Sequence, residues 1–355
     1  MSRTKKEPTP ASVTVSDKVR EGLIKRFAKD GNINIGTIDT HFSAVTRWLD
    51  TGIPELNWAI SGSSDKGLPF GRIISFDGPE QSGKTALGYF ILGQAAKQGA
   101  VPFLIETEAA IDPDFAAKNS LDTTQTIVIG MEKKPVIDDV FAKIAEVINT
   151  CAEAGSPAVL VLDSLPACLP NDDDIAKGYE GTRAAQKIRA IFTRFLTTLA
   201  TNDFMLIIIN HLIQDTSSLH PRLIPRGGTG FRHYLSVRVS LDIKEYLRKN
   251  KTNRDDYPYG VIVEGLVEKS RFCSPKRRTR FQITFAAGVD IAMSIFHQLK
   301  RNGIITTTGA WYEMNGQKFH MADWYDIYNN DPGIKEIAYE QYSEEKESAD
   351  MANES

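Results

Sequence analysis

The feature that most constrains this chain is one eight-residue stretch, Gly78-Pro79-Glu80-Gln81-Ser82-Gly83-Lys84-Thr85. It fits the pattern G-x-x-x-x-G-K-[ST], and it follows an apolar run at residues 72–76 and opens a helical pattern at Lys84. In this context the glycines let backbone N–H groups close around phosphates at a helix N-terminus. The competing interpretation is a glycine turn that caps an ordinary helix. The motif predicts a strand, a phosphate-binding loop and a helix, with Lys84 reaching the β and γ oxygens of a nucleotide.

The fold class follows from the pattern around this loop. From residue 71 onward, apolar runs rich in β-branched residues alternate with helical patterns, which predicts an α/β fold with a mostly parallel sheet. The predicted strands are continuously apolar, as burial under helices on both faces requires. After Tyr234 the helical patterns stop, and three extended stretches predict an antiparallel edge. The expected strands cover residues 72–76, 101–105, 158–162, 204–209, 235–243, 261–267 and 281–285, and expected helices begin at residues 84, 135 and 182.

The chain divides into four predicted segments. Residues 1–48 form an N-terminal arm with a short amphipathic helix over residues 17–29, and residues 49–289 form the α/β core. Residues 290–334 form a small C-terminal α+β region with an aromatic cluster, and residues 335–355 form an acidic tail. A length of 355 residues is typical of a protein with about two domains.

Several classes of protein are disfavoured by composition. The longest apolar run, residues 204–209, is far shorter than the roughly 20 residues that span a bilayer. The basic start leads into no apolar signal-peptide core. Cys151, Cys168 and Cys273 lie far apart in the sequence, so their spacing predicts neither a disulfide framework nor a zinc module. We therefore expect a cytoplasmic protein with no membrane partner.

The net charge of −3 argues against a nucleic-acid partner, but the charge distribution reverses this impression. Acidic residues collect after residue 335, whereas a basic stretch without acids lies near residue 275. We expect a basic surface that suits a polyanion. The basic residues of this stretch are Lys269, Arg271, Lys276, Arg277, Arg278 and Arg280.

A magnesium site is predicted from the Thr85 hydroxyl and from Asp163, which ends the apolar run at residues 158–162. The alternative for Asp163 is that it caps the following turn. The guanine signature N-K-x-D is missing, because Asn250-Lys251-Thr252-Asn253 lacks the acid. ATP is therefore the expected nucleotide.

Polar residues also end two other predicted strands. Glu106 and Glu108 follow the run at residues 101–105, where ligands bind in open α/β sheets. We choose Glu108 as the residue that orients water, the alternative being that both glutamates cap the helix beginning near Asp112. His211 follows the run at residues 204–209, where it can sense a γ-phosphate, although a lone histidine is more often structural.

Together these residues resemble the RecA family of recombinases, and most closely its phage branch of the UvsX type, from about residue 49 to residue 324. The resemblance to bacterial RecA rests on Leu68 to Ile73, Gly78 to Thr85, Ile111-Asp112-Pro113, Asp163-Ser164, Gln282-Ile283 and Gly309 to Tyr312. The resemblance to the phage branch rests on Asn210-His211, Gly227 to Gly230 and Val267 to Arg271. It implies a RecA-like P-loop ATPase core, with an oligomerisation helix in the N-terminal arm.

The resemblance also implies roles for individual residues. Glu108 would be the catalytic glutamate, His211 the γ-phosphate sensor, and Asp112 and Phe115 would contact the adenine. Residues 166–181 and 213–228 would form two DNA-binding loops, and both are long for loops of an α/β sheet. Lys269 and Arg271 would reach the ATP of a neighbouring protomer. On the helix expected from residue 182, Arg183 and Lys187 lie on a face away from the apolar stripe, where they can contact DNA phosphates, the alternative being a solvated charged face. The candidate DNA contacts in the second loop are Arg222, Arg226, Gly227 and Gly228.

The sequence departs from bacterial RecA at three places. The first loop is shorter and carries Asp172, Asp173 and Asp174, the sensor is His211 in place of glutamine, and the C-terminal domain is truncated. These departures affect the expected DNA contacts more than the nucleotide site.

The function expected from these features is ATP-dependent DNA recombination, with a filament on single-stranded DNA that pairs with a homologous duplex. The implied cofactors are ATP and Mg²⁺. The implied partners are single- and double-stranded DNA, further copies of the chain, and a single-strand-binding protein or loader, in the cytoplasm of a bacterial host if the chain is phage-encoded. The alternatives are a ring helicase, or a recombination mediator that coats DNA without turnover. The intact motif and the presence of Glu108 disfavour the mediator.

Overall fold

The computed structural model describes residues 15–27, 29, 44–108, 111–130, 135–165, 190, 192–193, 195–196, 198–215, 222–225, 232–250 and 255–342. The chain divides into two compact units, Met1–Ala44 and Val45–Ser355. The first unit contains α1 (Val15–Phe27), which confirms the predicted helix. Its apolar side chains Val19, Leu23 and Phe27 are exposed.

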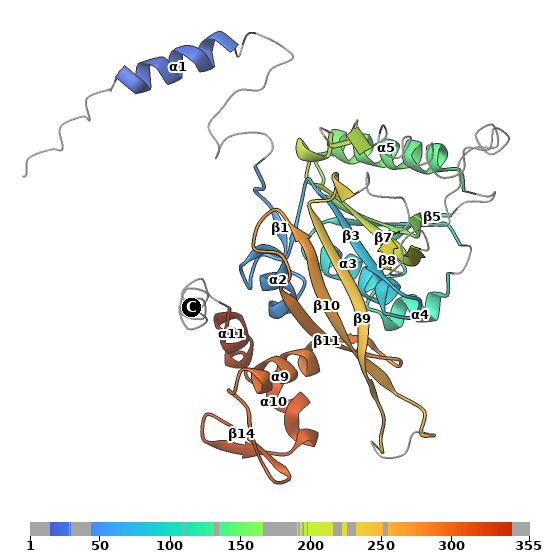
Figure 1. Cartoon of the computed structure of the whole chain (residues 1–355), viewed down its shortest axis with the longest axis vertical. Helices are drawn as coiled ribbons and strands as arrows, with labels where there is room; N and C mark the ends of the chain where they lie inside the picture. Colours follow the sequence, from blue (N-terminus) through green and yellow to red (C-terminus); the bar gives the residue numbers. More distant parts are fainter. Residues whose placement is uncertain are drawn as a thin grey trace, which may run out of the picture. The chain divides into compact units, whose positions relative to one another are not determined.

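The second unit is built on a mixed sheet whose strand order is β12-β11-β10-β9-β3-β7-β6-β4-β5 (Figure 1). Neighbouring strands from β9 to β5 are parallel, whereas β9, β10, β11 and β12 pair in antiparallel fashion. This confirms the predicted parallel sheet with an antiparallel edge. The strands are β3 (Ile73–Gly78), β4 (Val101–Glu106), β5 (Ile127–Gly130), β6 (Ala158–Asp163), β7 (Phe204–Asp215), β9 (Val237–Leu247), β10 (Gly260–Ser270), β11 (Arg278–Thr284) and β12 (Gly288–Asp290).

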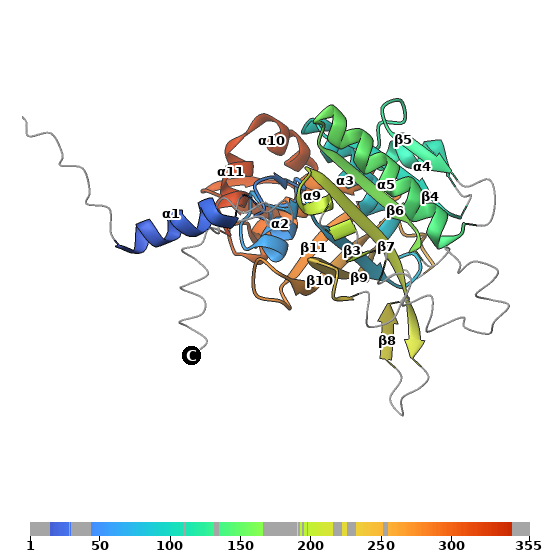
Figure 2. The ribbon, with the colours of Figure 1, turned by 90° about the horizontal axis from the view of Figure 1, so that it is seen from above.

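Burial on both faces explains the continuous apolar runs of the central strands. All residues of β3 are buried, and successive side chains point to opposite faces. Ile74 and Phe76 pack in a core with α3 (Lys84–Lys97), whereas Ile73 packs in a second core with α5 (Ile137–Ala154). Figure 2 shows α5 lying along the sheet on this second side. Helices therefore cover both faces, as the sequence predicts.

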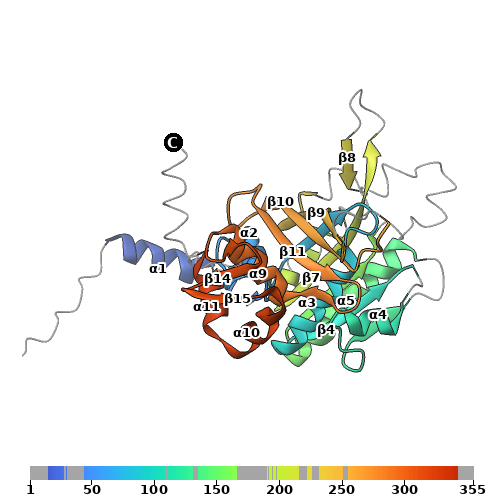
Figure 3. The same ribbon diagram turned by 90° about the horizontal axis from the view of Figure 1, so that it is seen from below.

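The edges of the sheet differ from the expected strands in two places. β5 was not expected, because it has only four residues and exposes Ile127 and Val128. β7 continues to Asp215, beyond the apolar run, and pairs with β8 (Arg222–Pro225) in antiparallel fashion. Figure 3 shows these two strand ends projecting past the rest of the sheet. The short helix α4 (Pro113–Lys118) lies between β4 and β5 in the chain.

Small elements precede and follow the sheet. β1 (Trp48–Leu49) pairs with β2 (Leu68–Pro69), and α2 (Pro54–Ser61) lies between them in the chain. After β12 come α9 (Ile291–Arg301), the strands β13 (Thr306–Thr308), β14 (Trp311–Met314) and β15 (Gln317–Phe319), the 3₁₀ helix η2 (Met321–Asp323), α10 (Trp324–Asn330) and α11 (Gly333–Glu340). These C-terminal elements share a third core, in which Trp324 is fully buried.

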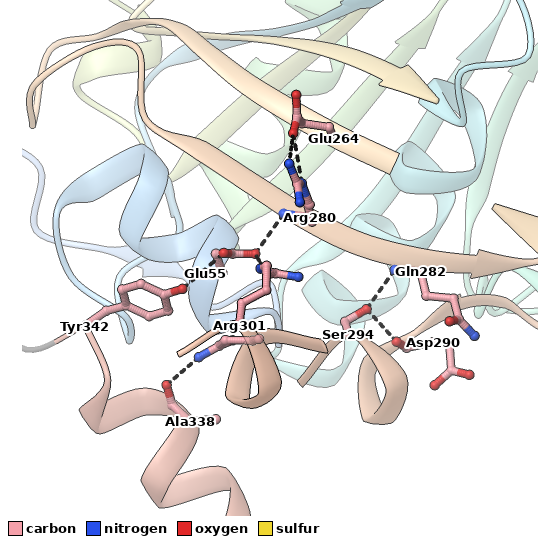
Figure 4. A network of polar contacts seen from close by, with 10 residues as sticks. Glu55, Glu264, Arg280, Gln282, Asp290, Ser294, Arg301, Ala338 and Tyr342 are labelled. Atoms are coloured by element: carbon pink, nitrogen blue, oxygen red, sulfur yellow. Dashed lines mark hydrogen bonds and ion pairs between the residues drawn. The ribbon is translucent and has the colours of Figure 1, made fainter. Parts of the chain in front are cut away.

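The C-terminal region is joined to the rest of its unit through Glu55 on α2 (Figure 4). Its carboxylate accepts hydrogen bonds from Arg301 (2.6 Å), from the backbone N–H of Arg280 (2.7 Å) and from the Tyr342 hydroxyl (3.1 Å). The Tyr339 hydroxyl donates to Asp50 at 2.7 Å. The helical, packed chain thus continues past residue 335, where the acidic tail was expected to begin. Within the described ranges, no helix is both long and apolar enough to cross a bilayer.

Candidate nucleotide site

The loop between β3 and α3 has the shape that the sequence motif demands. Gly83 has φ +85°, and a Cβ at this position would approach the Ile283 side chain to 2.7 Å. At Gly78 a Cβ would approach the Ser82 Oγ to 2.4 Å and the Leu241 carbonyl to 2.6 Å. A side chain at either position would displace backbone or core atoms, so both glycines are required by close packing.

Lys84 lies at the centre of this loop. Its ammonium donates to the Pro79 carbonyl at 2.5 Å, and its side chain is buried. Burial lowers the pKa of Lys84, and the carboxylates of Asp163 and Glu80 oppose this shift. The ammonium is thus held by the Pro79 carbonyl and the Ser82 hydroxyl of the loop and is attracted by nearby carboxylates.

Asp163 ends β6 and faces the first turn of α3. Burial raises the pKa of Asp163 to about 6, a hydrogen bond from Thr85 opposes the rise, and the carboxylates of Glu108 and Glu106 add to it. Parallel register places Glu106 beside Asp163 on the neighbouring strand β4. The predicted pair of Thr85 and Asp163 is therefore brought together.

The glutamate that ends β4, Glu106, and the one that follows it, Glu108, have different surroundings. Glu106 is 7% exposed and accepts a 2.7 Å hydrogen bond from the backbone N–H of Glu108. The Glu108 side chain is 47% exposed, accepts from the Ser164 hydroxyl at 2.6 Å, and lies 3.8 Å from Nε2 of His211. Of the two carboxylates, Glu108 is the one with room to contact a ligand.

A cavity of about 830 Å³ lies over these residues. Nine of the predicted site residues line it: Glu80, Gln81, Gly83, Lys84, Thr85, Glu108, Phe115, Asp163 and His211. Gly78, Pro79 and Ser82 belong to the loop but are not lining residues. Thus a single cavity brings together the loop, the aspartate that ends β6, the glutamate after β4 and the histidine of β7.

Asp112 is not among the lining residues. Its carboxylate caps α4 by accepting from the Asp114 N–H at 2.9 Å. Phe115 lines the cavity, is 41% exposed, and makes an edge contact with Tyr89 at 5.9 Å between ring centroids. Contact of Asp112 with an adenine stays a prediction, whereas Phe115 already presents an aromatic face.

Sequence reasoning missed several lining residues. Tyr89, Asn119 and Phe285 line the cavity together with Val261, Ile283 and Thr284. Burial raises the pKa of Tyr89 to about 12. Tyr89 follows Thr85 by four positions on α3, so helical periodicity was a usable signal for it. The residues of β10 and β11 carried no such signal, because they approach the loop only through tertiary packing.

Lys269 and Arg271 are not lining residues of this cavity. Lys269 donates to the carbonyls of Arg232 (2.7 Å) and His233 (3.4 Å), and Arg271 donates to the carbonyl of His233 at 3.1 Å. Both side chains thus reach the same short backbone segment, as expected for residues on one face. Their action on a neighbouring protomer's ATP stays a prediction.

Most of the predicted DNA contacts lie outside the described residues. This holds for Arg183, Lys187, Arg226, Gly227 and Gly228, and for most of both predicted loops. Only the backbone of Arg222 is described, as the first residue of β8. These assignments therefore stay predictions.

Comparison with known proteins identifies the family. Residues 18–290 match the RecA N-terminal domain. The chain is 25% identical over 307 residues to Protein RecA of Trichodesmium erythraeum (strain IMS101), covering 85% of this chain and 80% of that protein. It is 26% identical over 324 residues to Protein RecA of Ectopseudomonas oleovorans, covering 90% and 85%. A crystal structure of the RadB recombinase aligns with a TM-score of 0.48 and 16% identity, over 68% of this chain and 98% of that one. Because the family match covers more than half of its length, the chain belongs to the RecA N-terminal domain family.

Proposed function

We propose that this protein is an ATP-dependent DNA recombinase that forms a filament on single-stranded DNA and catalyses homologous pairing and strand exchange. The observation that carries the proposal is the single cavity lined by Lys84, Thr85, Glu108, Asp163 and His211, in a chain of the RecA N-terminal domain family. We further propose that it belongs to the phage branch of the UvsX type. This finer assignment rests on Asn210-His211 and on the stretch from Val267 to Arg271.

The residues present suit ATP with Mg²⁺. The Thr85 hydroxyl and the Asp163 carboxylate are hard oxygen donors of the kind that Mg²⁺ prefers, usually together with phosphate oxygens and water. Across the described ranges, no group of three or more His, Cys, Asp or Glu side chains is arranged to chelate a metal ion by itself. We infer that Thr85 and Asp163 hold Mg²⁺ only together with the phosphates. Bound Mg²⁺ would neutralise charge that develops on those oxygens.

The other side chains of the cavity supply positioning and proton transfer. Lys84 would leave the Pro79 carbonyl and contact the β and γ oxygens of ATP. Glu108 would accept a proton from, and orient, the attacking water. His211 lies 3.8 Å from Glu108, close enough for both to respond when a γ-phosphate binds beside them. Because His211 lies on β7, it would pass this change to the predicted loop at residues 213–228.

Assembly and DNA binding form the second part of the proposal. The exposed apolar face of α1 suits a second copy of the chain, and Lys269 with Arg271 would reach that neighbour's ATP. The two predicted loops and the six candidate residues named above would contact DNA. A single-strand-binding protein or loader would assist on single strands. Similarity to bacterial RecA proteins also suggests a bacterial cytoplasm as the place of action.

The decisive experiment is strand exchange between circular single-stranded DNA and a homologous linear duplex, with ATP and with a nonhydrolysable analogue. We expect joint molecules with both nucleotides and DNA-dependent release of phosphate with ATP. Unwinding of a duplex without a homologous partner would indicate a helicase instead. DNA binding without hydrolysis or joint molecules would indicate a mediator.

A further inference from the structure

A buried charged group lies directly before the phosphate loop but outside the cavity. Asp77, the residue before Gly78, has a fully buried side chain and is not a lining residue. Its carboxylate forms an ion pair with Nε of Arg238 on β9 and accepts a hydrogen bond from the Ser75 hydroxyl. The Arg238 side chain is 12% exposed. The centre of the sheet therefore contains an ion pair that does not line the nucleotide cavity, although the Asp77 carboxylate helps to oppose the lowering of the pKa of Lys84 by burial.

Stability alone is a weak explanation for this pair. Burial raises the pKa of Asp77, and the guanidinium of Arg238 offsets this rise only in part. Buried ion pairs are often no more stable than apolar groups of the same volume, because both ions lose their hydration. The other large side chains of β3, such as Ile73 and Phe76, are apolar, so the sheet itself requires no charge here.

The ion pair links two segments that the proposed function uses. At one end, Asp77 is joined to Gly78, which packs so closely on β9 that a Cβ would approach the Leu241 carbonyl to 2.6 Å. At the other end, Arg238 lies shortly after Arg232 and His233, whose carbonyls accept from Lys269 and Arg271. The phosphate loop and the segment held by these two cations therefore meet at Asp77 and β9.

The local charges are unbalanced. The single carboxylate of Asp77 attracts both Arg238 and Arg232. The pKa of Arg232 is lowered by burial and by repulsion from Arg238, whereas the carboxylates of Asp77 and Glu268 oppose that shift. The pKa of Lys269 is likewise lowered by burial and by Arg271. In the part of the chain that the structure describes, Nε of Arg232 has no hydrogen-bond partner. Two carboxylates, Asp77 and Glu268, therefore attract this cationic segment, and of the two Asp77 is the one whose side chain is fully buried in the sheet.

We propose that Asp77 is a positioning residue that couples the phosphate loop to residues 232–238, and through them to the placement of Lys269 and Arg271. The inference rests on the proposed function, because it concerns how DNA binding changes ATP hydrolysis. A shift of the phosphate loop when ATP binds moves the backbone of Asp77, and the two arginines follow its carboxylate. By linkage, ordering of residues 232–233 on DNA acts back on the loop.

The test compares ATP hydrolysis at saturating single-stranded DNA with hydrolysis without DNA, in wild type and in Asp77→Asn. This substitution keeps the side chain's shape and removes its charge. We expect the DNA stimulation to fall about tenfold, within the roughly 5–150-fold range of measured couplings between sites. The affinity for ATP without DNA should stay within about twofold, because Asp77 does not line the cavity and acts on Lys84 less than Asp163 and Glu80 do. An equal loss of ATP affinity would overturn the proposal, since it would mean that Asp77 only supports the loop.

Three further variants keep the test decisive. Arg232→Gln removes a partly buried cation whose Nε has no hydrogen-bond partner among the described residues, so it carries the test if Asp77→Asn does not fold, and we expect the same loss of stimulation. Arg238→Gln combined with Asp77→Asn should lower the DNA stimulation no further than either single change does, because the two residues act as one unit. Arg301→Gln is the matched control, because it breaks the ion pair with Glu55 in the C-terminal region and should lower thermal stability without changing stimulation.

The outcomes separate the inference from the proposed function. If wild type shows no DNA stimulation, the proposed function fails and this inference fails with it. If wild type is stimulated while Asp77→Asn and Arg232→Gln retain full stimulation, only the inference is overturned. Loss of stimulation in Arg301→Gln to the same extent would also overturn it, because any buried ion pair would then have the same effect.

Discussion

The Ser164 hydroxyl donates a 2.6 Å hydrogen bond to Oε1 of Glu108, although the two residues are 56 positions apart in the chain. Ser164 is fully buried and directly follows Asp163. Its backbone N–H donates to the Thr107 hydroxyl at 2.9 Å, and that hydroxyl donates to the Ser164 carbonyl at 2.9 Å. Hydrogen bonds thus join the ends of β4 and β6 beside Glu108, whose carboxylate we propose as the base.

Ser164→Ala should slow ATP turnover while leaving ATP binding nearly unchanged. Hydrogen bonds to charged groups contribute about 1.5–3 kcal/mol, so we expect turnover to fall by about tenfold or more. Steady-state kinetics should place the loss in kcat with little change in KM. Ser164→Thr, which keeps a hydroxyl, should recover most of the rate. A normal rate in the alanine variant would mean that Ser164 does not position Glu108.

Glu108→Gln should bind ATP and DNA but hydrolyse ATP far more slowly. Removal of a positioned base usually lowers the rate about 10²–10⁴-fold. Single-turnover hydrolysis and nucleotide binding measured on the same preparation separate the two effects. Glu106→Gln is the matched control for Glu108→Gln, because it makes the same change at a buried glutamate whose carboxylate accepts a hydrogen bond from the Glu108 backbone N–H. Wild-type turnover in Glu108→Gln would contradict the assignment of Glu108 as the catalytic base.

Lys269→Ala combined with Arg271→Ala should leave ATP binding by isolated protomers intact, because neither residue lines the cavity. DNA-stimulated hydrolysis should be lost, since each protomer lacks the cations that would reach its neighbour's ATP. Lys84→Ala protomers should fail to bind ATP and to extend filaments, because Lys84 provides the loop's ammonium.

Mixing these two variants tests action between protomers. Hydrolysis should return only in mixtures, where one protomer contributes the phosphate loop and the other contributes the two cations. If the double variant instead loses DNA affinity but hydrolyses ATP normally at saturating DNA, Lys269 and Arg271 contact DNA and not the ATP of a neighbouring protomer.

Truncation after Tyr342 should increase affinity for duplex DNA at low magnesium. It removes five acids and one lysine, so a local negative charge no longer competes with phosphate for the basic surface. A cut after Ile334 would be a poorer test, because it would remove most of α11 and the Tyr342 contact with Glu55.

Fluorescence anisotropy across a range of salt concentrations measures the effect of the tail. On single strands the log–log slope should be about −0.7 per phosphate neutralised. A full-length variant with the five acids changed to Asn and Gln should reproduce the truncation. Unchanged affinity and slope in both variants would show that the tail acts only on solubility.

The local parts of the site were predictable because their residues are contiguous. The loop from Gly78 to Thr85 and the strand that ends at Asp163 each carry their chemistry within a few positions, together with the strand or helix that presents it. Parallel strands end at one edge of the sheet, so the order of the elements also predicted that Glu108 and His211 would meet the loop. The antiparallel edge followed from the loss of helical patterns after Tyr234.

Other features depended on packing between distant segments. Asp77 and Arg238 are 161 positions apart, and nothing in either local pattern indicates that they pair. Phe285 lines the cavity because the neighbouring Ile283 of β11 packs against Gly83 of the loop. The last described residues of the chain reach Asp50 through Tyr339 and Glu55 of α2 through Tyr342. The sequence by itself determined the phosphate loop, the strand ends and the class of fold, because these depend on short-range geometry and periodicity. Only the tertiary structure decided which side chains complete the cavity and which buried charges pair, because these depend on the register between strands far apart in the chain.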